Sequence, residues 1–227
     1  QPPLGQITWG QIVQQAENPI EVDKERGNWI IPSALLTRSK SAQIERGCFG
    51  LLTLDIDKDP PNVERLRSIL AVVWGGAESI IYSTKSATVA TPKARVLIPI
   101  PSCDYVTWHC AQRAFYQQLE SHGIKPDLAL LDPNQIIYLP NRGEYYVSHH
   151  TQGRIFNPVD HWRDEMTEFW RQHFKPKPTP TPIKEKPPTT VNSSPSNHTI
   201  SGMDAIRLFN ATYPVGDILI QAGYDEN

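Results

Sequence analysis

The chain has 227 residues, of which 39% are apolar, and a formal net charge of −2. The apolar content is enough for a hydrophobic core, whereas the charge excludes a protein that coats nucleic acid by bulk charge, so any such contact needs a local basic groove. No apolar run approaches the ~20 residues of a membrane span, and three cysteines without the spacing of a metal site indicate thiols of a reducing cytosol.

Residues 1–174 alternate helical and strand-like patterns. The patterns predict helices at 9–16, 61–74, 103–123 and 160–174, and strands at 48–57, 79–84, 94–100, 136–140 and 144–150. The strand at 48–57 is expected to be central because it is almost entirely apolar, and the last two strands are expected to form a hairpin across residues 141–143. Strands in mixed order with interposed helices predict an α+β (mixed α/β) domain around a central sheet.

A proline-rich tract follows this domain. Residues 175–199 are rich in Pro, Ser, Thr and Lys and almost free of apolar residues. They cannot bury enough surface to fold, so we expect a disordered linker. Apolar spacing returns in residues 200–227, where short helices are predicted as the start of a further C-terminal domain.

Two aspartates, Asp55 and Asp57, end the apolar strand in the segment CFGLLTLDIDKDPP. Side chains alternate along a strand, so both carboxylates are expected on one side while Ile56 points to the other. Two adjacent carboxylates repel unless a proton or a cation lies between them, and hard divalent cations such as Mg²⁺ or Mn²⁺ prefer oxygen ligands. The pair therefore indicates a divalent-metal site, with an ordinary solvated strand end as the alternative.

A second polar segment is IIYSTKSATVATPKARVLIPIP, residues 80–101. Its turn gathers small hydroxyl side chains, including Ser83 and Ser86, and Lys93 and Arg95 follow before the next strand. Hydroxyls, backbone amides and cations at one turn are typical of a phosphate-binding loop. An ordinary polar hairpin with Arg95 in an ion pair is the alternative.

A third segment, PDLALLDPNQIIYLPNRGEYY, offers Asp127 and Asp132 as sources of a further carboxylate. In this order, the three segments resemble the catalytic domain of the archaeo-eukaryotic primase superfamily, and most closely the primase–polymerase branch found in phage and plasmid replication proteins. The resemblance covers roughly residues 9–174 and rests on the ordered triplet of motifs. It implies a two-part domain with an RRM-like catalytic sheet.

The resemblance implies template-directed nucleotidyl transfer, that is, DNA primase and DNA polymerase activity on dNTP or NTP substrates with two Mg²⁺ or Mn²⁺ ions. Asp55, Asp57 and, by best match, Asp127 would be the catalytic metal ligands, with Asp132 as the alternative third ligand. The implied nucleotide contacts are Ser83, Lys85, Ser86, Lys93 and Arg95. Lys85 stands where the second motif of the family often has a histidine.

The implied partners are a single-stranded DNA template and primer, nucleotides, and a fused or associated helicase domain. The implied setting is the cytoplasm of a bacterial host of the phage or plasmid, with no membrane partner. Basic residues expected near the template are Arg38, Lys40, Arg46 and Arg142, although a solvated surface explains them equally well. A non-catalytic replication or origin-binding module of the same fold is the rival, favoured by Lys85 in place of histidine. A DxD glycosyltransferase is a third reading, but no sugar-nucleotide domain is recognisable.

Overall fold

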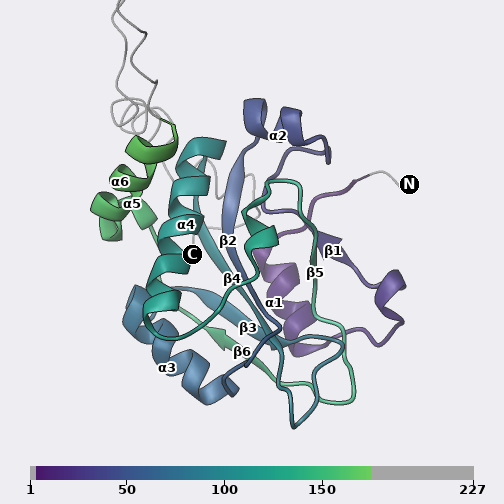
Figure 1. Cartoon of the computed structure of the whole chain (residues 1–227). Helices are drawn as coiled ribbons and strands as arrows, with labels where there is room; N and C mark the ends of the chain where they lie inside the picture. The colour runs from purple at the N-terminus through teal and green to yellow at the C-terminus, as the bar shows by residue number, and fades with distance from the viewer. Residues whose placement is uncertain (1–3, 175–227) are drawn as a thin grey trace, which may run out of the picture.

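The computed structural model describes residues 4–174 (Figure 1). The predicted linker at 175–199 and the helices predicted in 200–227 lie outside the described residues. The helices are α1 (Trp9–Glu17), η1 (Lys24–Arg26), α2 (Lys40–Arg46), α3 (Val63–Trp74), α4 (Tyr105–Ser121), η2 (Leu128–Leu131), α5 (Pro158–His161) and α6 (Arg163–His173). The strands are β1 (Trp29–Ile30), β2 (Phe49–Ile56), β3 (Ser79–Ser83), β4 (Ala94–Cys103), β5 (Ile137–Tyr138) and β6 (Ser148–Thr151).

Four strands form the main sheet in the order β2-β4-β3-β6, and every neighbouring pair is antiparallel. The helix α3 connects β2 to β3, and β4 lies between these two strands, which makes a split β-α-β unit. A second antiparallel sheet consists of β1 and β5. The described chain is therefore an α+β domain, and this prediction is confirmed.

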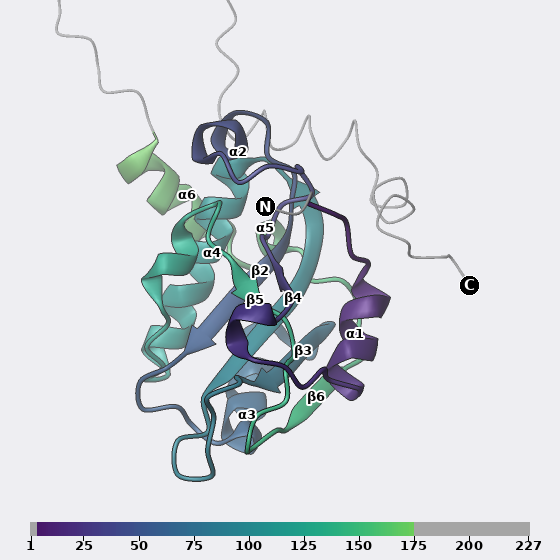
Figure 2. The ribbon, with the colours of Figure 1, turned by 90° about the vertical axis from the view of Figure 1, so that its right-hand side faces the viewer.

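Helices cover both faces of the main sheet, with α4 and α1 on opposite sides in Figure 2. On the face of β2 toward the α3 and α4 side, Leu52, Leu54 and Ile56 are completely buried. The opposite face is polar near the end of β2, where Asp55 lies beside Arg95 of β4 and Arg95 lies beside Tyr82 of β3. The Tyr82 hydroxyl donates to the carbonyl of Tyr138 at 2.7 Å, so the small sheet packs over this polar face.

The strand β2 lies at the edge of the main sheet, so the prediction of a central position is wrong. Backbone atoms of residues 32–34 bond to the start of its free edge, and side chains of α4 cover the middle. The Gln112 amide accepts from the backbone N–H of Thr53 at 3.0 Å and donates to its carbonyl at 2.7 Å, and Trp108 Nε1 donates to the carbonyl of Leu51 at 2.9 Å. These contacts replace the hydrogen bonds of a neighbouring strand, which explains how so apolar a strand can occupy an edge.

The predicted hairpin across residues 141–143 is also wrong, because β5 pairs with β1 whereas β6 pairs with β3. The segment between β5 and β6 contacts the N-terminal part of the chain through Asn141, whose side chain accepts from Val22 N at 3.1 Å and donates to Val22 O at 3.0 Å. The following Gly143 lies so close to the loop after β3 that an added Cβ would be 2.1 Å from the Lys85 carbonyl oxygen. Contacts between distant segments therefore decide this pairing.

The other predicted helices and strands are present, and their ends follow the local signals. The helix α4 begins after Asp104, whose carboxylate accepts from Thr107 N at 2.8 Å, and the chain leaves it through Gly123 at a φ of 79°. The helix expected at 160–174 is divided in two at Trp162. Among residues 4–174, no helix is long and apolar enough to cross a membrane.

Candidate metal and nucleotide site

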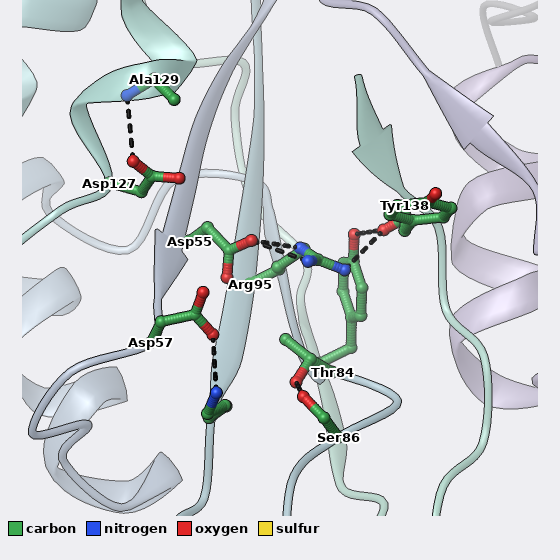
Figure 3. Close-up of polar contacts among 10 residues, drawn as sticks. Asp55, Asp57, Thr84, Ser86, Arg95, Asp127, Ala129 and Tyr138 are labelled. Atoms are coloured by element: carbon green, nitrogen blue, oxygen red, sulfur yellow. Dashed lines mark hydrogen bonds and ion pairs between the residues drawn. The ribbon is translucent and has the colours of Figure 1, made fainter. Parts of the chain in front are cut away.

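The three predicted carboxylates lie near one end of β2 (Figure 3). Asp55 is the second-last residue of β2 and is 8% exposed, whereas Asp57 follows the strand and is exposed. Asp127 reaches the same end of β2 because its backbone N–H donates to the carbonyl of Asp55 at 3.1 Å. The tertiary structure thus brings together residues that are about seventy positions apart in the sequence.

Asp55 forms a buried ion pair with Arg95. Its Oδ2 accepts from Arg95 Nε at 2.8 Å and lies 2.7 Å from Arg95 Nη2. Burial raises the pKa of the Asp55 carboxyl above its usual value, Arg95 opposes this rise, and repulsion from Asp57 and Asp127 adds to it. For Arg95, burial is the largest influence and acts to lower the pKa, but Asp55, Tyr82 and Asp57 together raise it, so the net shift is upward. With two short N–H donors on one oxygen, we regard the pair as ionised at neutral pH.

The second oxygen of Asp55 is available for a ligand. Asp55 Oδ1 is buried and has no hydrogen-bond partner among residues 4–174, and Figure 3 shows it directed toward the carboxylate of Asp57. Two facing carboxylate oxygens, one of them without a partner, fit a hard divalent cation completed by water or phosphate oxygens. Asp55 and Asp57 are therefore the residues that would hold such a cation.

Asp127 is close to this pair but has a different contact. Its Oδ1 accepts from the backbone N–H of Ala129 at 3.0 Å and caps η2. No group of three His, Cys, Asp or Glu residues in the described part of the chain is arranged to hold a single ion. Asp55 and Asp57 are therefore a candidate pair, and the metal-ligand roles of all three aspartates stay predictions.

A cavity of about 100 Å³ lies beside the carboxylates. All five residues predicted to contact a nucleotide line it together with Asp57, and so do residues that the sequence did not single out as contacts. The complete lining is Lys24, Asp57, Tyr82, Ser83, Thr84, Lys85, Ser86, Lys93, Arg95, Tyr138, Leu139 and Asn141. The polar segment after β3 and the start of β4 therefore form one pocket, as the phosphate-binding interpretation requires.

Several side chains of this pocket already have partners within the protein. Lys93 Nζ lies 3.3 Å from Asp57 Oδ1, and Lys85 Nζ donates to the carbonyl of Arg142 at 2.5 Å. The Ser83 hydroxyl bonds to the backbone of Val147, whereas Ser86 is exposed and its hydroxyl lies 3.4 Å from that of Thr84. The Lys85 contact connects two loops, so the charge expected in place of the family histidine is partly engaged in the fold.

The basic residues predicted near the template do not gather at the pocket. The strand β2 has eight residues, about 25 Å at the rise of a strand, and α2, which contains Lys40 and Arg46, lies at its other end (Figure 1). There Lys40 pairs with Asp132 at 2.6 Å, and Arg38 lies over the ring of Trp29 at 5.4 Å. Of the four, only Arg142 is in a segment next to the pocket, through the contact of its carbonyl with Lys85.

Replacing Arg95 should change the pH at which the site binds a divalent cation. Arg95 lowers the pKa of Asp55, so Arg95→Gln should raise that pKa further, and Asp55 must be ionised to bind a cation. We therefore expect the midpoint of Mn²⁺ binding, measured against pH, to move to higher pH in Arg95→Gln. Lys93→Gln is the control because its partner Asp57 is exposed, and an identical midpoint for Arg95→Gln and the wild type would contradict the assigned role of the ion pair.

Comparisons of the chain with protein-family models, with curated proteins and with solved structures found no match.

Proposed function

We propose that the chain carries the catalytic domain of a primase–polymerase, which transfers nucleotides to a primer on a single-stranded DNA template. The substrates would be dNTPs or NTPs, and the setting would be phage or plasmid replication in a bacterial host, with an associated helicase domain. The observation that carries the proposal is the position of the unpartnered Asp55 Oδ1, which faces Asp57 at the edge of a pocket lined by hydroxyls and cations. A carboxylate pair beside a phosphate-binding pocket is what metal-assisted phosphoryl chemistry needs.

In this proposal Asp55 and Asp57 hold the divalent cations, which supply charge stabilisation for an in-line displacement at the α-phosphate. Arg95 favours the ionised form of Asp55, because its two N–H groups bond one carboxylate oxygen and oppose the effect of burial on the pKa. Lys93 lines the pocket next to Asp57 and is placed to offset phosphate charge. Asp127 would complete the metal site if its side chain left the N–H of Ala129.

The split β-α-β unit supports the proposal of an RRM-like catalytic sheet, because β2, α3, β3, β4 and α4 follow one another in that order. The carboxylates lie on one edge strand and the predicted phosphate loop follows β3, with β4 between the two strands. The fourth strand, β6, lies beside β3 at the opposite edge from β2. This arrangement leaves the end of β2 next to η2, which carries Asp127 at its start.

A non-catalytic DNA-binding module remains the second candidate. The observation in its favour is that the three cationic residues predicted to contact phosphate already have partners within the protein. Lys85 bonds to the carbonyl of Arg142, Lys93 pairs with Asp57, and Arg95 pairs with Asp55. A purely structural role of these residues needs no other contact. In a catalytic role, the same side chains would have to bind phosphate in addition to these partners or instead of them.

Incorporation of labelled nucleotides by the complete chain separates these functions. With Mg²⁺ or Mn²⁺ and a primed single-stranded template, we expect incorporation of the complementary nucleotide, abolished by a chelator. Binding of the same DNA without any incorporation would overturn the catalytic proposal in favour of the binding module. A parallel reaction without primer measures initiation, which is a separate activity from extension.

A further inference from the structure

A second element of the pocket comes from the N-terminal part of the chain, which none of the sequence motifs includes. Residues 20–22 run beside Asn141, with a bridge between Ile20 and Asn141 and a bond from Arg142 N to Ile20 O at 2.7 Å. Together with the two bonds between Asn141 and Val22, these contacts fix the start of η1 against the pocket wall. The first residue of η1, Lys24, lines the cavity.

Lys24 differs from the other cations of the pocket because, within the described residues, its charge meets an aromatic ring and neither a carboxylate nor a carbonyl. Arg95 and Lys93 face carboxylates, and the Lys85 ammonium donates to a carbonyl. Lys24 is exposed, and across residues 4–174 it makes neither an ion pair nor a hydrogen bond through its ammonium group. Its Nζ lies over the ring of Tyr138, 5.6 Å from the ring centre. A cation held over an aromatic face keeps its N–H donors free for an anion.

The position of Lys24 indicates which part of an anionic substrate it would meet. Asp55 contacts Arg95, and Arg95 Cζ lies over the same Tyr138 ring at 5.9 Å. Figure 3 shows Tyr138 on the side of Arg95 away from Asp55. Lys24 and Arg95 therefore both approach the Tyr138 ring, and Lys24 lines the same cavity as Asp57. A triphosphate whose α-phosphate is near Asp55 and Asp57 would extend its terminal phosphate through this cavity to Lys24.

We propose that Lys24 binds the terminal phosphate of the incoming nucleotide, so that the N-terminal segment makes the pocket selective for triphosphates over monophosphates. This inference rests on the proposed nucleotidyl-transfer function. Asn141 fixes the position of the segment that carries Lys24, and no carboxylate within residues 4–174 pairs with the Lys24 charge. The hydrogen bond of an ammonium to a phosphate is of the strong, charge-assisted class.

The test measures nucleotide affinity without turnover. The complete chain is bound to a template with a dideoxy-terminated primer and Mg²⁺, and the dissociation constants of complementary dATP and dAMP are compared. Lys24→Gln should weaken dATP binding about tenfold, the effect of losing one charge-assisted hydrogen bond, and leave dAMP binding unchanged. Lys24→Arg should restore most of the dATP affinity. Arg26→Gln is the matched control, because Arg26 is exposed on the same short helix and does not line the cavity.

The possible outcomes separate the role of Lys24 from the proposed function. Wild-type affinity for dATP in Lys24→Gln, or an equal loss for dATP and dAMP, would overturn the role of Lys24 and leave the proposed function standing. Failure of the wild-type protein to bind the complementary dATP would instead overturn the proposed function itself. Lys24 is exposed, so its replacement should not impair folding, which the unfolding midpoint verifies.

Discussion

Asp57→Asn is expected to lower the rate of template-directed incorporation by about 10²–10³-fold, the range seen when one group that stabilises transition-state charge is removed. The substitution removes the negative charge that faces Asp55 Oδ1 and so weakens the proposed cation site. Stability should change by less than about 1 kcal/mol, because Asp57 is exposed and its ion pair with Lys93 is near the surface. Incorporation kinetics with Mg²⁺ and with Mn²⁺, together with urea unfolding, measure both effects.

Asp59→Asn is the matched control for this experiment. Asp59 lies two positions further along the same loop, is exposed, and is 3.9 Å from Lys125. Its φ of 48° is one that asparagine adopts readily, so the substitution adds no backbone strain. Incorporation at the wild-type rate by Asp57→Asn with both metals would refute the carboxylate-pair site.

Asp57 is better suited to this test than Asp55, because replacing Asp55 would also destabilise the fold. Removing the Asp55 carboxylate would leave the Arg95 guanidinium, whose side chain is 13% exposed, without its partner. An unpaired buried charge of this kind costs about 3–5 kcal/mol. Loss of activity in Asp55→Ala would therefore combine unfolding with loss of the metal ligand, and the Asp57 variant separates the two.

Gln112→Ala is expected to lower the free energy of unfolding by about 2–4 kcal/mol, through an unpaired backbone N–H and the volume removed from a buried position. Gln112 is completely buried and bonds both the N–H and the carbonyl of Thr53. The Tyr116 hydroxyl also donates to that carbonyl at 3.2 Å, so the N–H suffers the larger loss. Urea unfolding monitored by circular dichroism gives the value.

Gln117→Ala on the same helix is the control, because Gln117 is exposed and its replacement removes no bond to β2. It should alter stability by at most about 0.5 kcal/mol. An equally small effect for Gln112→Ala would show that the side chains of α4 do not stabilise the free edge of β2.

The regular elements were predictable because their signals are local. The apolar run ending in Asp55 and Asp57, the helical spacing of α3 and the capping residue Asp104 of α4 each act within a few residues of sequence. The segment after β3 was predictable as a phosphate-binding candidate for the same reason. Its hydroxyls and cations are close in the sequence, and the structure places them around one cavity.

The edge position of β2 was not predictable from its composition. An apolar strand normally indicates burial between two other strands, but here Gln112 and Trp108 of α4 bond to the backbone of Thr53 and Leu51 on the free side. The residues that do this are separated from β2 by more than fifty positions in the sequence. Their role depends on the packing of α4, which no local pattern specifies.

The sequence by itself determined the α+β class, most helix and strand positions, and the residue types of a site with paired carboxylates beside a polar turn. The tertiary structure alone decided that β5 and β6 belong to different sheets. It also decided that Arg95 pairs with Asp55, and that the bonds of Asn141 hold the segment of Lys24 at the pocket. The physical reason is the range of the interactions. Periodicity and capping act between neighbours in the chain, whereas strand pairing and buried ion pairs join residues that only the packed core brings together.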